Sequence, residues 1–163
     1  MVPETITLPT LHVAILRAMG WDGGHLHEFV FASGRYGPSE PGWDQPEDWL
    51  PETRVKLSKA LAYGISTFEY VYDFGDNWRH LVQIEDVLPP RTDADRSVRC
   101  VAGANACPPE DVGGVPGYAD FVRSIANPND EAHEQSLTWI GGSFDPRAFD
   151  LALANERLTD FKL

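Results

Sequence analysis

Residues 68–87 read FEYVYDFGDNWRHLVQIEDV and contain the clearest fold signal in the chain. Apolar and polar residues alternate over 68–72 and again over 78–87, which is typical of strands that bury one face. Gly75, Asp76 and Asn77 lie between these runs, and such residues tolerate the backbone conformations of tight turns. The stretch therefore predicts a long β-hairpin.

The turn decides the register of this hairpin, and two alternatives are open. A two-residue loop at 76–77 places Asp73 opposite His80, whereas a loop at 75–76 places Asp73 opposite Trp78. In either register, Asp73 or Asp76 could orient the imidazole of His80, because a carboxylate bonded to one ring nitrogen fixes the tautomer of the other. The alternative is a purely structural turn. The letters DFG alone do not indicate a kinase, since the other kinase motifs are absent.

Before the hairpin, the sequence predicts a helix over residues 8–19, capped by Thr7 and ended by Gly20. Residues 25–31 (HLHEFVF) alternate as a strand that carries His25 and His27 on one face. Residues 37–53 hold four prolines and predict an irregular surface segment anchored by Trp43 and Trp49. A strand edge and a helical turn starting at Ser58 are expected within residues 55–63.

After the hairpin, residues 98–101 are a candidate strand, and the remaining pattern is helical. Helices are expected over 118–125 and 130–139, and a third is expected to start at Asp145-Pro146 and to carry the apolar residues between 149 and 158. This order predicts a single α+β domain with an antiparallel sheet, the long hairpin, and helices packed against one face. A chain of 163 residues suffices for one domain that buries about 68–70% of its unfolded surface.

Composition narrows the classes of function. The chain has 13 basic and 25 acidic residues, a net charge of −12 without a basic stripe, so direct nucleic-acid binding is disfavoured. It has neither an apolar run long enough to span a membrane nor the pattern of a signal peptide, so no membrane association and a cytoplasmic location are expected. Cys100 and Cys107 would be free thiols in a reducing compartment, although a disulfide between them remains open.

Two groups of residues are candidates for chemistry. The first combines the histidine strand with the hairpin, and its members are His25, His27, Asp73, Asp76, Trp78 and His80. If these strands are neighbours, His25, His27 and His80 could hold zinc or iron, but packed histidines are commoner than ligands, so no metal or other cofactor is expected. The second is a loop with Cys107, Glu110 and Asp111, in which nearby acids would raise the pKa of the thiol and disfavour a nucleophile.

Five blocks in order resemble one known family: residues 18–29 (AMGWDGGHLHEF), 70–85 (YVYDFGDNWRHLVQIE), 100–114 (CVAGANACPPEDVGG), 117–121 (GYADF) and 139–150 (WIGGSFDPRAFD). The chain is similar to the plasmid pRiA4b ORF-3-like family over about residues 8–155. Members of that family have no established activity, and some carry insertion-sequence passenger or resolvase-like labels. Recombinase chemistry is not expected, because the chain is acidic and poor in arginine. Family members usually have an additional strand before the first helix, whereas Val2-Pro3 opens this chain, so either the start is truncated or this member lacks that strand. In the first case an open sheet edge would favour a homodimer.

Three functions follow from these observations. The first is a non-enzymatic binding or accessory domain whose hairpin and histidine strand recognise a protein or a small ligand. The second is a metal-dependent or acid-base enzyme that uses His25, His27, Asp73, Asp76 and His80. The third is an accessory protein of a mobile element.

Overall fold

The computed structural model describes residues 1–39, 42, 45–61, 64, 66–89 and 97–159, and shows an α+β architecture. Its sheet has five strands in the order β3-β2-β1-β4-β5. The strands are β1 (His27–Phe31), β2 (Gly34–Gly37), β3 (Trp49–Pro51), β4 (Thr67–Tyr72) and β5 (Trp78–Gln83). All neighbours pair antiparallel except β2 and β3, which are parallel.

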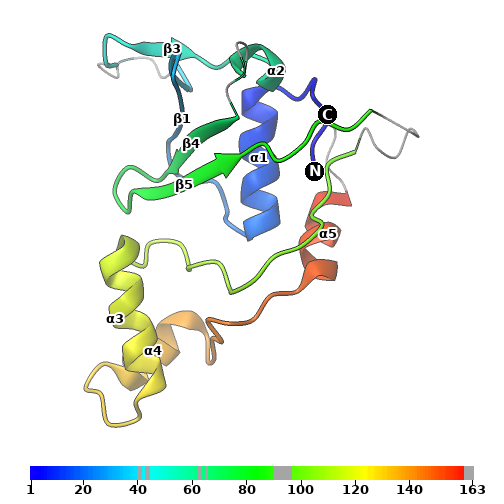
Figure 1. Ribbon diagram of the computed structural model, residues 1–163. Helices are drawn as coiled ribbons and strands as arrows, with labels where there is room; N and C mark the ends of the chain where they lie inside the picture. Colours follow the sequence, from blue (N-terminus) through cyan, green and yellow to red (C-terminus); the bar gives the residue numbers. More distant parts are fainter. Residues whose placement is uncertain (40–41, 43–44, 62–63, 65, 90–96, 160–163) are drawn as a thin grey trace.

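Helix α1 (Leu8–Met19) lies across one face of this sheet, as Figure 1 shows. Its boundaries agree with the prediction: Thr7 accepts a hydrogen bond from the Thr10 amide, and Gly20 ends the helix in the left-handed conformation. The core between helix and sheet is rich in aromatic rings. Its largest fully buried side chains are Leu8, Phe29, Tyr70 and Tyr72.

The predicted hairpin is formed by β4 and β5, but both predicted registers are wrong. Tyr72 pairs with Trp78 and Tyr70 pairs with His80, so residues 73–77 make a longer loop. Asp73 causes this geometry: its backbone has φ of 56°, its carboxylate accepts a hydrogen bond from the Gly75 amide, and its carbonyl accepts one from the Asn77 amide. This Asx-type turn forms in place of the two-residue loops predicted at 75–76 and 76–77.

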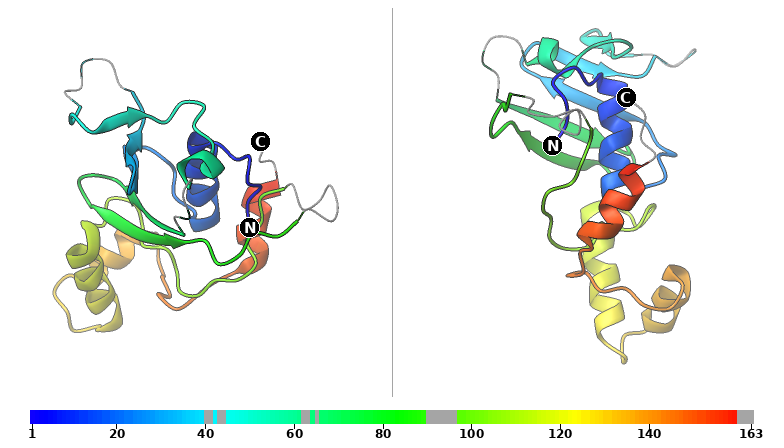
Figure 2. Two further views of the ribbon diagram at one scale, coloured as in Figure 1. Left: turned by 45° about the horizontal axis from the view of Figure 1, so that its top comes forward. Right: turned by 90° about the vertical axis from the view of Figure 1, so that its right-hand side faces the viewer.

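The other helices are α2 (Leu57–Ala60), α3 (Gly114–Ala126), α4 (His133–Ile140) and α5 (Leu151–Thr159). Helix α5 packs beside α1, whereas α3 and α4 pack on each other beyond the end of the sheet where the hairpin loop lies (Figures 1 and 2). The third C-terminal helix starts later than predicted, because Asp150 rather than Asp145 bonds the amide of the first turn. No described helix combines the length and the apolar character that crossing a membrane requires.

Two segments differ from their predictions. Residues 34–37 and 49–51 are strands within a region expected to be turns and surface excursion, and Trp49 is buried there. The expected strand at 98–101 is absent, because the side-chain amide of Asn155 bonds both the N–H and the C=O of Cys100 in place of a partner strand. Trp43, residues 62–63 of the expected helical turn, and the loop at 90–96 lie outside the described residues.

Candidate functional site

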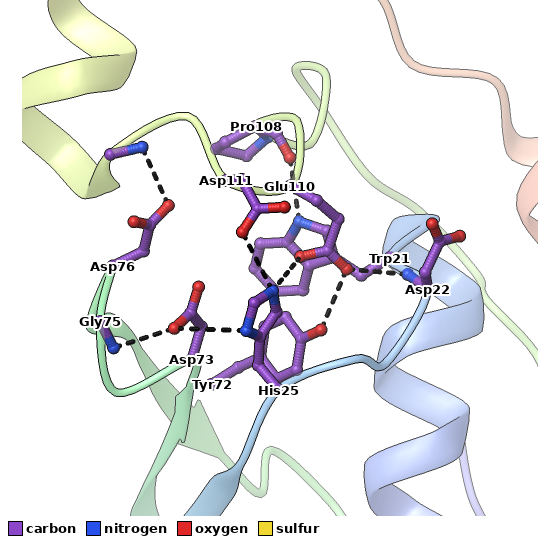
Figure 3. A network of polar contacts seen from close by, with 11 residues as sticks. Trp21, Asp22, His25, Tyr72, Asp73, Gly75, Asp76, Pro108, Glu110 and Asp111 are labelled. Atoms are coloured by element: carbon purple, nitrogen blue, oxygen red, sulfur yellow. Dashed lines mark hydrogen bonds and ion pairs between the residues drawn. The ribbon is translucent and has the colours of Figure 1, made fainter.

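Three loops meet at the end of the sheet, and each contributes acidic or imidazole side chains (Figure 3). One loop precedes β1 and carries His25, the hairpin loop carries Asp73, and the segment before α3 carries Glu110 and Asp111. We call His25, Asp73, Glu110 and Asp111 the loop cluster. It joins members of both groups that the sequence singled out separately.

His25 lies at the centre of the loop cluster. Its Nε2 is 3.2 Å from Asp111 Oδ1 and 4.0 Å from Glu110 Oε2, and its Nδ1 is 3.7 Å from Asp73 Oδ1. Asp73 is buried, whereas the imidazole is about one-third exposed and the Asp111 side chain is largely exposed. The cluster therefore has a closed side, formed by Asp73, and a side open to solvent.

Hydrogen bonds hold the acidic side chains in place. Glu110 Oε1 accepts bonds from the Tyr72 hydroxyl at 3.0 Å and from the Asp22 amide at 2.8 Å. Burial, followed by the bond to Glu110, raises the pKa of Tyr72, so its hydroxyl stays protonated and donates. Trp21 fixes the same segment, since its indole N–H donates to the Pro108 carbonyl at 2.9 Å.

Asp76 is not part of the loop cluster. It connects the hairpin loop to the segment before α3, which carries Glu110 and Asp111. Its Oδ2 accepts a hydrogen bond from the Gly113 amide at 3.0 Å, at the start of α3, where a carboxylate is favourable. Gly114 packs its Cα against the Asp76 backbone, and a side chain at Gly114 would collide with the Asp76 carbonyl oxygen. The contact positions Asp111 beside His25.

Two features of the loop cluster concern its charge. Within the described chain, His25 is the partner in every ion pair of Asp73, Glu110 and Asp111, so three carboxylates face one imidazole. In addition, the Oε2 atom of Glu110 is buried without a hydrogen-bond partner among the described residues. A buried carboxylate oxygen in this state is costly unless a proton or a cation approaches it.

His27 and His80 do not join His25, so the three histidines considered above as possible zinc or iron ligands do not form one site. Among the described residues, the one group of at least three possible metal ligands within reach of one another is His25, Asp73 and Asp111. His27 and His80 lie on β1 and β5, two strands apart, and their rings have other partners. His80 Nδ1 is 3.2 Å from the Tyr70 carbonyl, and burial lowers the pKa of this imidazole.

His27 belongs to a second set of side chains, the histidine cluster, which consists of the partly buried His12 and the buried residues His27, Glu52 and Tyr70. His27 Nε2 is 3.0 Å from Glu52 Oε2, and the His12 ring stacks on the His27 ring at 3.5 Å with an angle of 6° between planes. His12 Nδ1 is 2.8 Å from the Tyr70 hydroxyl. Burial, and to a lesser degree the neighbouring His27, lowers the pKa of His12 to about 3. Sequence inspection gave no signal for His12 or Glu52.

The surroundings of Trp78 and Cys107 indicate that both side chains contribute to packing. Trp78 is buried beside the Trp21 and Tyr118 rings, so the hairpin presents this ring to the core. Burial, and then the charge of Glu110, raises the pKa of the Cys107 thiol to about 12. At neutral pH the group is therefore a thiol.

The fold and the loop cluster define an α+β protein with an acidic, histidine-containing site at one end of its sheet. The chain belongs to a family described as Plasmid pRiA4b ORF-3-like protein, which it matches over residues 1–153. It is 37% identical over 163 residues to the uncharacterized protein y4hQ of Sinorhizobium fredii (strain NGR234), covering 98% of this chain and 81% of that relative.

A solved structure has the same fold. The crystal structure of MM3350, a protein of unknown function from Methanosarcina mazei Go1, is similar with a TM-score of 0.81 and 34% sequence identity. The similarity covers 93% of this chain and 84% of that chain. Function is therefore not established by these relatives, and the chemistry of the loop cluster is the basis on which one can be proposed.

Proposed function

We propose that this protein binds a divalent transition-metal ion at the loop cluster and uses the metal to hold a small ligand. The observation that carries the proposal is the set of donor atoms on His25, Asp73 and Asp111, which lie within 4.8 Å of one another. Metal bonds of about 2.0–2.2 Å would require separations of at most about 4.4 Å, so small side-chain rotations suffice. Imidazole and carboxylate donors together suit zinc, manganese or iron.

The charge of the cluster supports a cation as its occupant. His25 alone compensates Asp73, Glu110 and Asp111 within the described chain, and a neutral imidazole would leave all three carboxylates uncompensated. A divalent ion would reduce this repulsion, and it would also provide a partner for the buried Oε2 of Glu110. An ionic cluster with a protonated His25 is the alternative, and the loss of metal affinity in variants distinguishes the two.

The proposed role of the metal follows from the number of its protein ligands. Three ligands leave at least one coordination position for water or for an oxygen or nitrogen atom of a ligand. The His25 imidazole, about one-third exposed, and the exposed Asp111 face that position from the solvent side. The protein would thus act as a metal-dependent binding domain for a small molecule.

Metal-dependent hydrolysis is a second candidate, and Glu110 is the observation that favours it. Its Oε2 is 4.0 Å from His25 Nε2 and has no hydrogen-bond partner in the described chain, so it is available to accept a proton from a metal-bound water. Tyr72 and the Asp22 amide hold the other oxygen and thereby fix the orientation of the carboxylate.

Metal analysis tests the proposal. Protein without a histidine tag is stripped with EDTA and titrated calorimetrically with Zn²⁺ and with Mn²⁺, together with the variants His25→Ala and Asp73→Asn. We expect one ion per chain with micromolar or tighter affinity, and at least a hundredfold weaker binding in both variants. His133→Gln is the matched control, because His133 bonds the Ser124 carbonyl on another part of the fold. Binding that both site variants retain, or the absence of binding in the parent protein, would contradict the proposal.

A further inference from the structure

A cleft between α3 and α4 begins at the loop cluster. Its volume is about 460 Å³, within the range of about 300–1,000 Å³ that small-molecule sites occupy. The walls include Asp111, Val112, Asp120, Phe121, Arg123 and Trp139. Because Asp111 also contacts His25, a molecule in this cleft lies next to the proposed metal position.

Trp139 gives the cleft an aromatic surface. The residue is 50% exposed, and its ring contacts Phe121 edge-to-face with centroids 5.5 Å apart. This contact orients the indole but leaves half of the residue's surface uncovered. An exposed indole face attracts cations through its quadrupole, and tryptophan is the most effective aromatic residue in this respect.

The charges of the walls are negative on balance. Asp111 and Asp120 carry two negative charges, against one positive charge on Arg123. The arginine is itself held by carboxylates, at 2.6 Å from Asp120 Oδ1 and 3.9 Å from Asp130 Oδ2. The net charge of −12 adds a long-range field of the same sign. Anionic ligands are disfavoured in such a cleft, and cationic ligands are favoured.

From these contacts we infer that the cleft binds a small organic cation, a molecule with an ammonium group that packs on Trp139 and faces Asp120. The inference extends the proposed function by naming the chemical class of the ligand, and it rests on that function only for the metal at the Asp111 end. A donor atom elsewhere in the same molecule would then reach the metal. The metal and the bound molecule would then be in contact, so their affinities would be thermodynamically linked.

Choline and its neutral isostere 3,3-dimethylbutan-1-ol separate charge recognition from shape recognition. Each is titrated into the full chain in amine-free phosphate buffer and followed by calorimetry and by chemical-shift changes. We expect saturable choline binding and at least tenfold weaker binding of the alcohol. Equal affinity of the two probes, or no saturable binding of choline, would overturn the inference.

Variants locate the binding. Trp139→Leu and Asp120→Asn change exposed side chains and should leave the fold intact, and each is expected to weaken choline binding about tenfold. Leu81→Ala on β5 is the control for loss of an exposed apolar side chain and should bind as the parent does. Choline affinities that neither cleft variant changes would refute this location.

The two proposals can fail separately. The titration of EDTA-treated protein and of His25→Ala measures the cleft without the metal, and choline binding is expected to persist in both. A protein that binds choline but neither Zn²⁺ nor Mn²⁺ would refute the metal proposal alone. A protein that binds metal but not choline would refute the cation inference alone.

Discussion

Lowering the pH from 7.5 to 5.0 should destabilise this protein through His12. The ring is partly buried, stacks on His27, and pairs its Nδ1 with the Tyr70 hydroxyl. Burial also raises the pKa of Tyr70, so the hydroxyl donates and Nδ1 accepts. A proton on Nδ1 would oppose that bond and place a cation against a second imidazole in the core.

The magnitude follows from the shift of one pKa. Folding lowers the pKa of His12 from 6.5 to about 3, so the unfolded chain binds the proton more tightly. The stability that the neutral ring contributes is present above pH 6.5 and is lost as the pH falls toward the folded-state pKa. At about 1.36 kcal/mol per pH unit, the loss between pH 6.5 and pH 5.0 is about 2 kcal/mol.

Urea unfolding at pH 7.5 and pH 5.0 measures this loss in the parent protein and in His12→Gln, which does not titrate. We expect the parent to lose about 2 kcal/mol more than the variant over this range, whatever the variant's stability at pH 7.5. His133→Gln is the control and should follow the parent. Losses that agree within about 0.5 kcal/mol in parent and His12→Gln would refute the reasoning, because His12 would then have a similar pKa in both states.

Three further predictions concern stability and binding. Trp78→Ala should lower the free energy of unfolding by about 3–5 kcal/mol in urea melts, because the ring is buried among aromatic residues; an unchanged midpoint would contradict its place in the core. Asn155→Ala should cost about 1–3 kcal/mol by the same assay, since it removes both bonds to the Cys100 backbone. Duplex DNA should show no salt-sensitive binding in the range of about 10⁻⁴–10⁻⁶ M by fluorescence anisotropy, since the chain has a net charge of −12.

Local signals in the sequence predicted the elements that depend on them. The helix over residues 8–19 was predicted with its boundaries, because its cap and its terminal glycine act within one turn. The hairpin was predicted, but its register was not, because residues 73–77 are compatible with several turns and the bond from the Gly75 amide to the Asp73 side chain selects the longer loop. The absence of a strand at 98–101 depends on Asn155, a contact across 55 residues that no local pattern contains.

The candidate site was predictable only in parts. His25 and Asp73 were selected from the strand and hairpin, and Glu110 and Asp111 were selected from a separate loop. Their convergence depends on the packing of that loop through Trp21 and Tyr72, whose partners are 87 and 38 residues away in sequence. Contacts of this range lack a periodic signature, so residue types indicated the chemistry while the tertiary structure defined which residues share a site.

The bond between the Asp22 amide and Glu110 spans 88 residues, and this separation has a consequence for biosynthesis. All five strands and α1 are encoded before residue 84, so the sheet and its covering helix can assemble on a nascent chain that has not yet exposed Glu110 and Asp111. Until those residues leave the ribosome, His25 and Asp73 lack two of their carboxylate neighbours. The loop cluster can therefore form only after the segment that leads into α3 has been translated and has packed against the sheet.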